Sequence, residues 1–375
     1  MGAFRVKVAY VSQGYSPHDR RFLNALAANG VDVFHFQFEG RVTELRGTVS
    51  VCQHVDVGEL PSNTLDDGVG LKLKGQFNDY GIQIVLCGPL HSVGAFIARN
   101  VKCVIVQIAH AYDVLLEAHA SVENMTLIRE AIGSADGLFV DCEAVLDECR
   151  KVCSIPGGVP ILNIPWGIDL QRYKTKTSVR EDLFTREGWG DDSVVLLSIR
   201  SWEEIYQLDQ LLLFIREAKK RHHNIKLVLA GNGSLKNELN RLIEEYRLAK
   251  DVCTPGWITE SELCHHFEAA DVYISTAKCD GSSISLLQAM DSGAVSMVNR
   301  VGGNVDWVEH GANGWLFDMN LDSFLRCLDE CLASRSQWDE IRLRASELVH
   351  NRGDWQKNSK TLVAFLDEVL GGDSI

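Results

Sequence analysis

The chain has 375 residues, and its 37 lysines and arginines against 51 aspartates and glutamates give a formal net charge of -14. This balance argues against a protein that coats nucleic acid or anionic lipid, because both are bound through extended fields of basic residues. Hydrophobic residues make up 46% and charged residues 23% of the sequence, which is typical of globular proteins. The length exceeds what one hydrophobic core usually supports, so we expect two domains.

The eleven cysteines indicate neither a disulfide framework nor a metal site. No two form a Cys-x-x-Cys pair and several lie inside apolar runs, so we expect free, mostly packed thiols in a reducing cytosol. Residues 1–7 lead straight into a strand-like run, so we expect no signal peptide. The longest uncharged stretch, 80–98, is broken by glycines and a proline and is no transmembrane helix. We therefore expect a cytoplasmic protein whose membrane association is at most peripheral.

Short apolar runs alternate with amphipathic stretches along almost the whole chain. In the first half we predict a helix at 21–29 and strands at 6–11, 31–36, 82–87, 103–108, 137–140 and 161–164. A second series follows, with strands at 193–198, 225–230, 252–254, 272–275, 295–298 and 315–317. Helical patterns at 211–221, 235–248, 261–269 and 285–292 separate them, and three more end the chain at 321–334, 337–350 and 355–370. Apolar runs of this kind are typical of buried parallel strands in βαβ units.

The pattern predicts an α/β protein of two doubly wound, Rossmann-like domains that face each other across a cleft. The first domain is expected at 1–170 and the second at 193–354, with the polar stretch 171–192 as the linker.

The segment 275–290 is the most informative part of the sequence. A strand ends, a polar loop with a glycine and serines follows, and a helix begins, so that backbone N–H groups and the positive helix end face the same point. Asp280 lies in this loop, where its carboxylate can accept from sugar hydroxyls, and Gln288 lies in the first turns of the helix. The alternative is that Asp280 or Ser282 only caps the helix.

Two further loops of the same type lie nearby. Gly231-Asn232-Gly233 follows the strand at 225–230, and a third polar loop covers 298–304. All three lie beyond the carboxyl ends of predicted parallel strands, where α/β sheets bind ligands. Three such loops within one domain indicate a binding site for an anionic ligand.

At these residues the sequence resembles the retaining glycosyltransferases of family 4, which have the GT-B fold. The family carries two glutamates with seven residues between them, and the matching positions here are Asp280 and Gln288, in a helix that reads SLLQAM in place of SLLEAM. Further matches run over nearly the whole chain, at 164–169, 231–233, 256–258, 301–304 and 310–314. In this fold a C-terminal helix, here 355–375, crosses back to the first domain.

The resemblance also implies roles for single residues. Asp280 would contact the donor sugar, Arg200 would neutralise the diphosphate, and His110 would lie beside the reactive carbon of the sugar. The implied donor-binding residues are Gly231, Asn232, Gly233, Trp257, Ile258, Gly281, Ser282, Ser283, Ile284, Ser285 and Gln288. On the acceptor side they are Gly14, Asp19, Arg20 and Asp113, where for Arg20 an acceptor phosphate and a simple salt bridge remain open.

The sequence departs from the family at several of these positions. Both acids are altered, and a lysine expected a few residues after Arg200 is replaced near Tyr206. Glutamine can still hydrogen-bond a ribose, but without charge.

The resemblance therefore implies a metal-independent retaining glycosyltransferase without a cofactor. It would move a sugar from a nucleotide-diphosphate sugar, most often a UDP-sugar, to a hydroxyl of a sugar, glycan or lipid-linked acceptor in polysaccharide or glycolipid biosynthesis. Two alternatives are a non-catalytic nucleotide-sugar-binding partner of another transferase, and a GT-B epimerase or phosphorylase.

Overall fold

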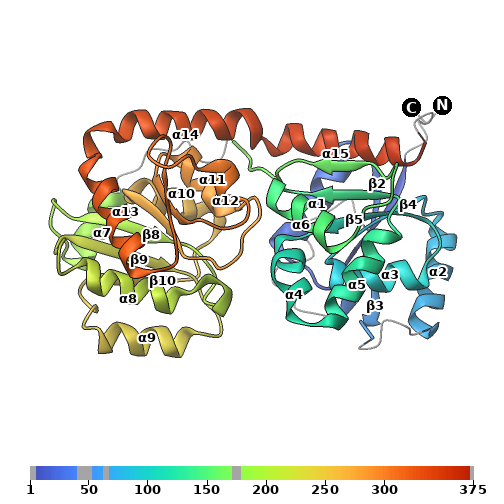
Figure 1. The fold of residues 1–375 in the computed structure, drawn as a ribbon, viewed down its shortest axis with the longest axis horizontal. Helices are drawn as coiled ribbons and strands as arrows, with labels where there is room; N and C mark the ends of the chain where they lie inside the picture. Colours follow the sequence, from blue (N-terminus) through green and yellow to red (C-terminus); the bar gives the residue numbers. More distant parts are fainter. Residues whose placement is uncertain (1–5, 40–52, 62–66, 171–178, 372–375) are drawn as a thin grey trace. The chain divides into compact units, whose positions relative to one another are not determined.

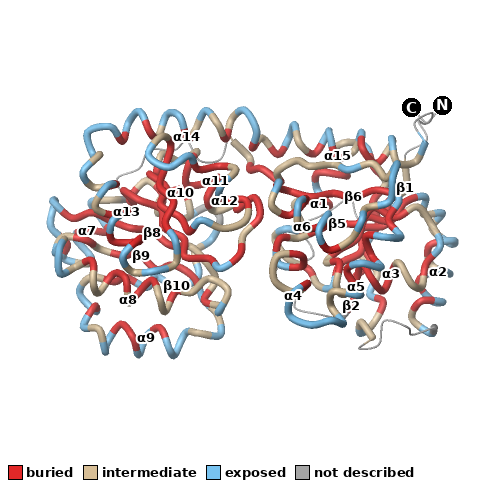
Figure 2. Tube along the Cα trace, viewed as in Figure 1, coloured by how far each residue is buried: buried red, intermediate tan, exposed pale blue. Residues whose placement is uncertain are grey.

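The computed structural model describes residues 6–39, 53–61, 67–170 and 179–371 (Figure 1). The chain divides into two compact units. Unit 1 comprises Met1–Trp166 and Trp355–Ile375, and unit 2 comprises Gly167–Asp354. Figure 2 shows that buried segments follow the strands of each unit, while the helices alternate between buried and exposed positions.

Unit 1 is built on a seven-stranded parallel sheet with the strand order β3-β2-β1-β4-β5-β6-β7. Its strands are β1 (Lys7–Ser12), β2 (Asp32–Glu39), β3 (Gln53–Glu59), β4 (Ile84–Cys87), β5 (Val104–Ala109), β6 (Gly137–Val140) and β7 (Ile161–Asn163). Its α-helices are α1 (Pro17–Ala28), α2 (Asp67–Tyr80), α3 (Ala95–Asn100), α4 (Ala118–Ala120), α5 (Val122–Gly133), α6 (Glu143–Val152) and α15 (Trp355–Val369). Two π-helical turns are η2 (Leu90–Gly94) and η3 (Asp113–Glu117).

Helices cover both faces of this sheet. On one face, alternate side chains of β1, β2, β4 and β5 form a buried cluster with side chains of α2 and α3. On the other face, the Phe22 ring of α1 lies 6.0 Å from Phe139 of β6 and 5.1 Å from Trp355 of α15. Gly137 permits the close approach of α15, since a Cβ there would lie 2.8 Å from a methyl of Val369. The C-terminal helix thus belongs to unit 1.

Unit 2 is built on a six-stranded parallel sheet with the order β10-β9-β8-β11-β12-β13. Its strands are β8 (Val194–Ser198), β9 (Ile225–Ala230), β10 (Val252–Gly256), β11 (Val272–Ser275), β12 (Val295–Asn299) and β13 (Trp315–Phe317). Its α-helices are α7 (Val179–Glu187), α8 (Leu208–Ala218), α9 (Lys236–Glu245), α10 (Glu260–Ala269), α11 (Ile284–Ser292), α12 (Asn304–Trp307), α13 (Leu321–Ala333) and α14 (Trp338–Arg352). Short 3-10 turns are η4 (Glu204–Tyr206) and η5 (Arg335–Gln337).

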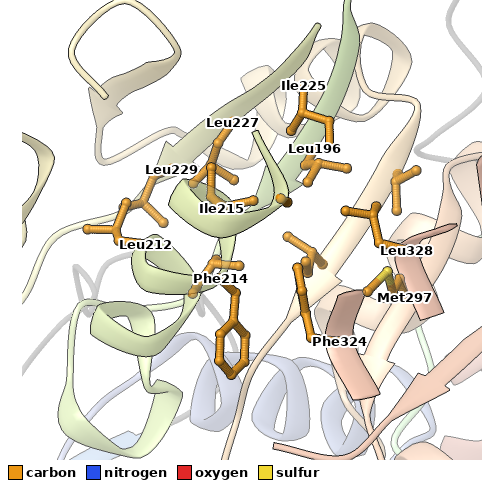
Figure 3. Packing of buried hydrophobic residues seen from close by; sticks show 14 of the residues in the cluster. Leu196, Leu212, Phe214, Ile215, Ile225, Leu227, Leu229, Met297, Phe324 and Leu328 are labelled. Atoms are coloured by element: carbon orange, nitrogen blue, oxygen red, sulfur yellow. The ribbon is translucent and has the colours of Figure 1, made fainter. Parts of the chain in front are cut away.

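The period of two along each strand divides the core of unit 2 between the two faces of its sheet. Leu196 of β8, Leu227 of β9 and Met297 of β12 pack with α8, α9 and α13 in one cluster, part of which is drawn in Figure 3. Their neighbours Val195 and Val228 point the other way and pack with α7, α10, α11 and α14. Because both faces are buried, the strands read as continuous apolar runs in the sequence.

The prediction of two parallel α/β sheets is confirmed, but three local expectations were incomplete. The strand β3 and helix α2 were not anticipated, because residues 53–59 alternate polar and apolar and lie at the sheet edge. Helix α1 begins at Pro17 and not at residue 21, since Ser16 and Asp19 form a capping box.

The expected linker at 171–192 is corrected in part. Residues 179–187 form helix α7, and Leu183 and Phe184 are buried in the core of unit 2. Residues 171–178 of that stretch lie outside the described residues. The polar composition that suggested a linker reflects the solvent-facing side of α7.

Two further properties concern the chain as a whole. No disulfide joins any two of the ten cysteines in the described ranges. Over the same ranges, no helix combines the length and the apolar character that a bilayer crossing requires.

Candidate functional site

The main candidate site lies at the point of unit 2 where the strand order reverses. Strands β8 and β11 are neighbours in the sheet, and helical connections lead away from them in opposite directions. Such a switch point is where parallel α/β sheets bind ligands, beyond the carboxyl ends of the strands. Arg200 follows β8 and Asp280 follows β11, so the fold brings together two residues that are 80 positions apart in the sequence.

Arg200 is held by the loop that follows β11. Its Nη1 donates to the hydroxyls of Ser283 and Ser285 at 2.8 and 2.7 Å, and its Nη2 donates to Oδ1 of Asp280 at 3.2 Å. The guanidinium also lies 4.2 Å from the ring centroid of Tyr206, within the range of a cation–π contact. The side chain of Arg200 is 10% exposed and that of Asp280 is 12% exposed, so this ion pair is largely shielded from water.

The ion pair contains a guanidinium that stays charged and a carboxylate oxygen without a hydrogen-bond partner. Burial alone would lower the pKa of the Arg200 guanidinium, but the charge of Asp280, with contributions from Tyr206 and Tyr273, raises it above the usual value. Arg200 is therefore permanently charged. Oδ2 of Asp280 lies 3.2 Å from Nη1 of Arg200 but is buried without a hydrogen-bond partner, because both protons of Nη1 are directed at the serines.

The N-terminus of α11 faces the same region. Its N-cap is Ser283, whose side chain makes no capping hydrogen bond and accepts from Arg200 instead. The alternative that Asp280 or Ser282 caps this helix differs from the structure, in which the N-cap is Ser283. The hydroxyl of Ser282 accepts from Nε1 of Trp307 at 3.3 Å. Helix N-termini without side-chain caps are favourable positions for anions.

The loops after β9 and β10 border this region in the sheet order. The N–H of Gly231 donates to the carbonyl of Gly256 at 2.8 Å and joins the two loops. Gly231 has φ 141°, and a Cβ there would lie 2.6 Å from the carbonyl oxygen of Arg200, so only glycine fits. Trp257 follows Gly256 and is 64% exposed, which is unusual for so large an apolar side chain.

The remaining donor-side residues of the prediction lie in the same loops or in helix α11. Ile258 packs against the buried cluster that includes α11, and Gln288 is buried in α11 with 8% exposure. Asn232 and Gly233 form the turn after β9, where the side chain of Asn232 accepts from the N–H of Gly233 at 3.0 Å. Ile284 lies between Ser283 and Ser285, the serines that bind Arg200, and Gly281 lies two residues before Ser283.

In unit 1, the predicted acceptor-side residues fall into two groups, and the first surrounds Asp113. This carboxylate is 1% exposed, and its Oδ2 accepts from the N–H of Leu90 at 2.8 Å and of His110 at 3.3 Å. It thereby ties the loop after β4 to the loop after β5 and positions the backbone of His110. The His110 ring lies 5.2 Å from that of Trp166. Asp113 therefore has a structural role in holding these two loops, since its carboxylate is almost inaccessible to a ligand.

The second group lies in the loop after β1 and in the first turn of α1. Asp19 is buried and accepts from the hydroxyl of Tyr10 at 3.0 Å and from the N–H of Ser16 at 2.7 Å, which gives it a capping role. The carbonyl of Gly14 accepts from the Ser12 hydroxyl at 2.6 Å. Arg20 lies beside Asp19 in the first turn of α1 and is half-buried. Both carboxylate oxygens of Asp19 already accept hydrogen bonds, and Gly14 has no side chain, so neither residue offers a side-chain group to an acceptor.

Sequence reasoning missed two residues of these regions. The hydroxyl of buried Tyr273 lies 2.8 Å from that of Ser285 and supports a serine that binds Arg200; its position as an inward residue of β11 was the available signal. Nδ1 of His91 lies 3.4 Å from Oδ1 of Asp113. Burial alone would lower the pKa of His91, but Asp113, with Glu117, raises it above the ordinary value. No local motif marks His91.

Comparisons with known proteins identify relatives of both the sequence and the fold. Residues 179–347, all within unit 2, match the model of the family described as Glycosyl transferases group 1. The chain is similar to an uncharacterized glycosyltransferase of Methanocaldococcus jannaschii, with 25% identity over 53% of this chain and 50% of the relative. It is also similar to an alpha-monoglucosyldiacylglycerol synthase of Streptococcus pneumoniae, with 25% identity over 54% of this chain and 47% of the relative. The match thus spans about half the length of these two relatives.

A longer match joins both units. A GDP-mannose-dependent phosphatidylinositol monomannoside mannosyltransferase of Mycolicibacterium smegmatis is 23% identical over 87% of this chain and 85% of the relative.

Solved structures with the same fold are similar over nearly the whole chain. Sucrose-phosphate synthase from Thermosynechococcus elongatus has a TM-score of 0.81 at 16% identity and covers 98% of this chain and 100% of its own. HepE of Anabaena, solved in complex with UDP-glucose, has a TM-score of 0.79 at 16% identity and covers 97% and 100%. At such identities the likeness shows the fold alone. The chain therefore has a GT-B fold of two Rossmann-like units, and its residues 179–347 form a Glycosyl transferases group 1 domain.

Proposed function

We propose that the protein is a glycosyltransferase that moves a sugar from a nucleotide-diphosphate sugar to an acceptor hydroxyl. The observation that carries this proposal is the cluster of Arg200, Asp280 and the N-terminus of α11, at the strand-order reversal of a group 1 domain. It combines a permanent cation, backbone N–H groups for an anion and a carboxylate with an unused acceptor oxygen. These are the groups that a sugar diphosphate requires.

The parts of the donor are assigned to separate residues. Arg200 and the first N–H groups of α11 would hold the diphosphate, and Oδ2 of Asp280 would accept from a hydroxyl of the sugar. Trp257, exposed at the end of β10, would border the base, and Gln288 would hydrogen-bond the ribose. A UDP-sugar is our first choice of donor, because HepE was solved with UDP-glucose; GDP-mannose is the competing choice, because the Mycolicibacterium smegmatis relative depends on it.

The proposed reaction retains the anomeric configuration. The bond between C1 of the sugar and the diphosphate oxygen breaks, and its electron pair stays on the leaving diphosphate. The acceptor oxygen forms a bond to C1 on the same face, and its proton passes to a phosphate oxygen of the leaving group. Arg200 and α11 would stabilise the charge that grows on the diphosphate, in the way that preorganised donors stabilise an oxyanion. No protein nucleophile and no cofactor take part.

Arg200 and the helix N-terminus would also supply the positive charge that a metal ion could otherwise provide, so we propose a metal-independent transfer. Its test is the rate of transfer before and after treatment with EDTA: an unchanged rate supports this point, and a loss that Mg²⁺ or Mn²⁺ restores refutes it.

His110 would lie beside the reacting carbon, at the end of β5 in unit 1. For the acceptor we propose a glycan or glycolipid hydroxyl, since the relatives in Streptococcus pneumoniae and Mycolicibacterium smegmatis are named for lipid-linked products. A lipid-linked acceptor would require peripheral contact with a membrane. Ten described cysteines without a disulfide between them are typical of a protein in a reducing compartment, which supports a cytoplasmic location.

The deciding experiment is a donor panel of UDP-glucose, UDP-galactose, UDP-N-acetylglucosamine and GDP-mannose. Thermal shift would select the donor, and release of the nucleoside diphosphate, with and without glycolipid acceptors, would measure turnover. Slow hydrolysis of one donor without acceptor, abolished by Arg200→Ala, supports the proposal. A protein that neither binds nor hydrolyses any member of the panel refutes it.

A second candidate function is a nucleotide-sugar-binding partner of another transferase. It is motivated by Asp280 and Gln288, which stand where the related family has two glutamates. Tight binding of one donor without any turnover, with or without acceptor, would favour this reading. Formation of a free sugar epimer would favour an epimerase instead.

A further inference from the structure

The two residues proposed to hold opposite parts of the donor also contact each other directly. Nη2 of Arg200 donates to Asp280, and Nη1 donates to two serines of the same loop. Both side chains of the ion pair are about nine-tenths buried. A diphosphate that approaches this region therefore meets a cation whose charge is already balanced. Binding therefore requires that the guanidinium of Arg200 exchange at least part of its interaction with the Asp280 carboxylate for an interaction with the phosphates.

That exchange has a different cost for different ligands. When Arg200 turns to a phosphate, Asp280 becomes a buried carboxylate beside an anion, which is strongly unfavourable unless another donor satisfies it. A sugar attached to the diphosphate brings hydroxyl donors to that carboxylate. A nucleoside diphosphate alone brings none and adds its own negative charge.

We infer that Asp280 makes this site discriminate between the intact nucleotide sugar and the nucleoside diphosphate that remains after transfer. The intact donor exchanges one ion pair for a phosphate contact and a set of sugar hydroxyl contacts. The nucleoside diphosphate that remains after transfer competes with Asp280 for Arg200 but offers no sugar hydroxyls to the carboxylate. Transfer of the sugar thus weakens the hold on the product and promotes its release. This inference rests on the proposed function and adds a specificity-determining role for Asp280.

Two features of the site support the role. The unused Oδ2 of Asp280 is the acceptor that sugar hydroxyls would satisfy. The hydroxyls of Ser283 and Ser285 keep Arg200 in the site when it leaves Asp280, because they bind Nη1 and not the Nη2 that contacts Oδ1 of the carboxylate.

The test compares wild type with Asp280→Asn, which keeps the size and an acceptor oxygen but removes the charge. Titration calorimetry would measure the Kd of UDP and of UDP-glucose, with GDP and GDP-mannose as the parallel pair. We expect the nucleoside diphosphate to bind Asp280→Asn about tenfold more tightly, which is about 1.4 kcal/mol. The nucleotide sugar should gain less or should weaken, so the ratio of the two Kd values falls.

The matched control is Asp339→Asn, which changes the net charge equally at a fully exposed residue of α14 paired with Arg342. It should leave both Kd values unchanged. Asp280→Glu retains the carboxylate and should retain the discrimination. If Asp280→Asn does not fold, Asp280→Ser serves the same purpose, because its hydroxyl can accept from Arg200.

The outcomes separate this inference from the proposed function. If wild type transfers sugar but the nucleoside diphosphate binds Asp280→Asn as weakly as wild type, or more weakly, only the discrimination by Asp280 is refuted. If wild type binds none of the four nucleotides, the proposed function fails and this inference fails with it. A collapse of the Kd ratio in Asp280→Asn alone supports both.

Discussion

The ion pair between Arg200 and Asp280 permits a test that separates its effect on stability from its effect on the reaction. The perturbation is Arg200→Met, which keeps an unbranched apolar side chain but removes the charge and all three hydrogen bonds. The partner change is the double variant Arg200→Met with Asp280→Asn. The single variant leaves a buried carboxylate without its cation, and the double variant does not.

The magnitude follows from the burial of the pair, whose side chains are 10% and 12% exposed. Removing one partner of a buried pair costs roughly 3 to 5 kcal/mol, and the residual exposure places this site near about 3 kcal/mol. For a domain of the size of unit 2, that corresponds to a fall of about 6 to 12 °C in its unfolding midpoint. The double variant should recover at least about 2 kcal/mol, since an orphaned charge no longer remains.

Catalysis should not recover with stability. Loss of a preorganised cation at the leaving group is expected to lower kcat by about a hundredfold or more, and Asp280→Asn restores no positive charge. Circular dichroism during heating would follow unfolding, and release of the nucleoside diphosphate at saturating donor would give kcat. If the double variant regains both stability and turnover, Arg200 has only a structural role. If Arg200→Met unfolds like wild type, the account of the buried pair is wrong.

Three further predictions concern single residues. Gly231→Ala should lower both stability and donor kcat/KM, because its Cβ would crowd the carbonyl of Arg200. Gly311 also has a positive φ, 78° against 141° at Gly231, but open space around it, so Gly311→Ala should cost only the backbone strain of about 1 kcal/mol. Equal losses in both variants would contradict the role given to the Gly231 contact. Trp257→Ala should leave the unfolding midpoint unchanged but raise the donor Kd severalfold; an unchanged Kd would remove Trp257 from the site. The pKa of His91 is raised in the folded protein, where the histidine pairs with Asp113. This pairing therefore stabilises the protein fully below about pH 6.5, the ordinary histidine pKa. The stabilisation is lost as the pH rises through the pKa of His91 in the folded state. The midpoint difference between wild type and His91→Asn should therefore shrink from pH 5.5 to pH 8.5, and a pH-independent difference would count against it.

The sequence by itself determined the class of fold, because a strand buried on both faces is apolar at nearly every position. The strands of unit 2 were recognisable for this reason, and the loops after them identified Asp280 and Gly231. Edge strand β3 carries no such signal, since one row of its side chains faces water. Helix α7 was misread as a linker, because its polar residues outnumber the two, Leu183 and Phe184, that enter the core.

Only the tertiary structure decided which side chains meet. Local sequence places Arg200 and Asp280 after separate strands, and the order of β8 and β11 in the sheet makes them partners. In the same way, Asp113 resembles a ligand-binding residue in the sequence, but its burial against the N–H groups of Leu90 and His110 makes it a support for the loops. Periodicity reports whether a residue faces the core or the solvent, whereas contacts between distant loops depend on how the strands are ordered, which no local pattern encodes.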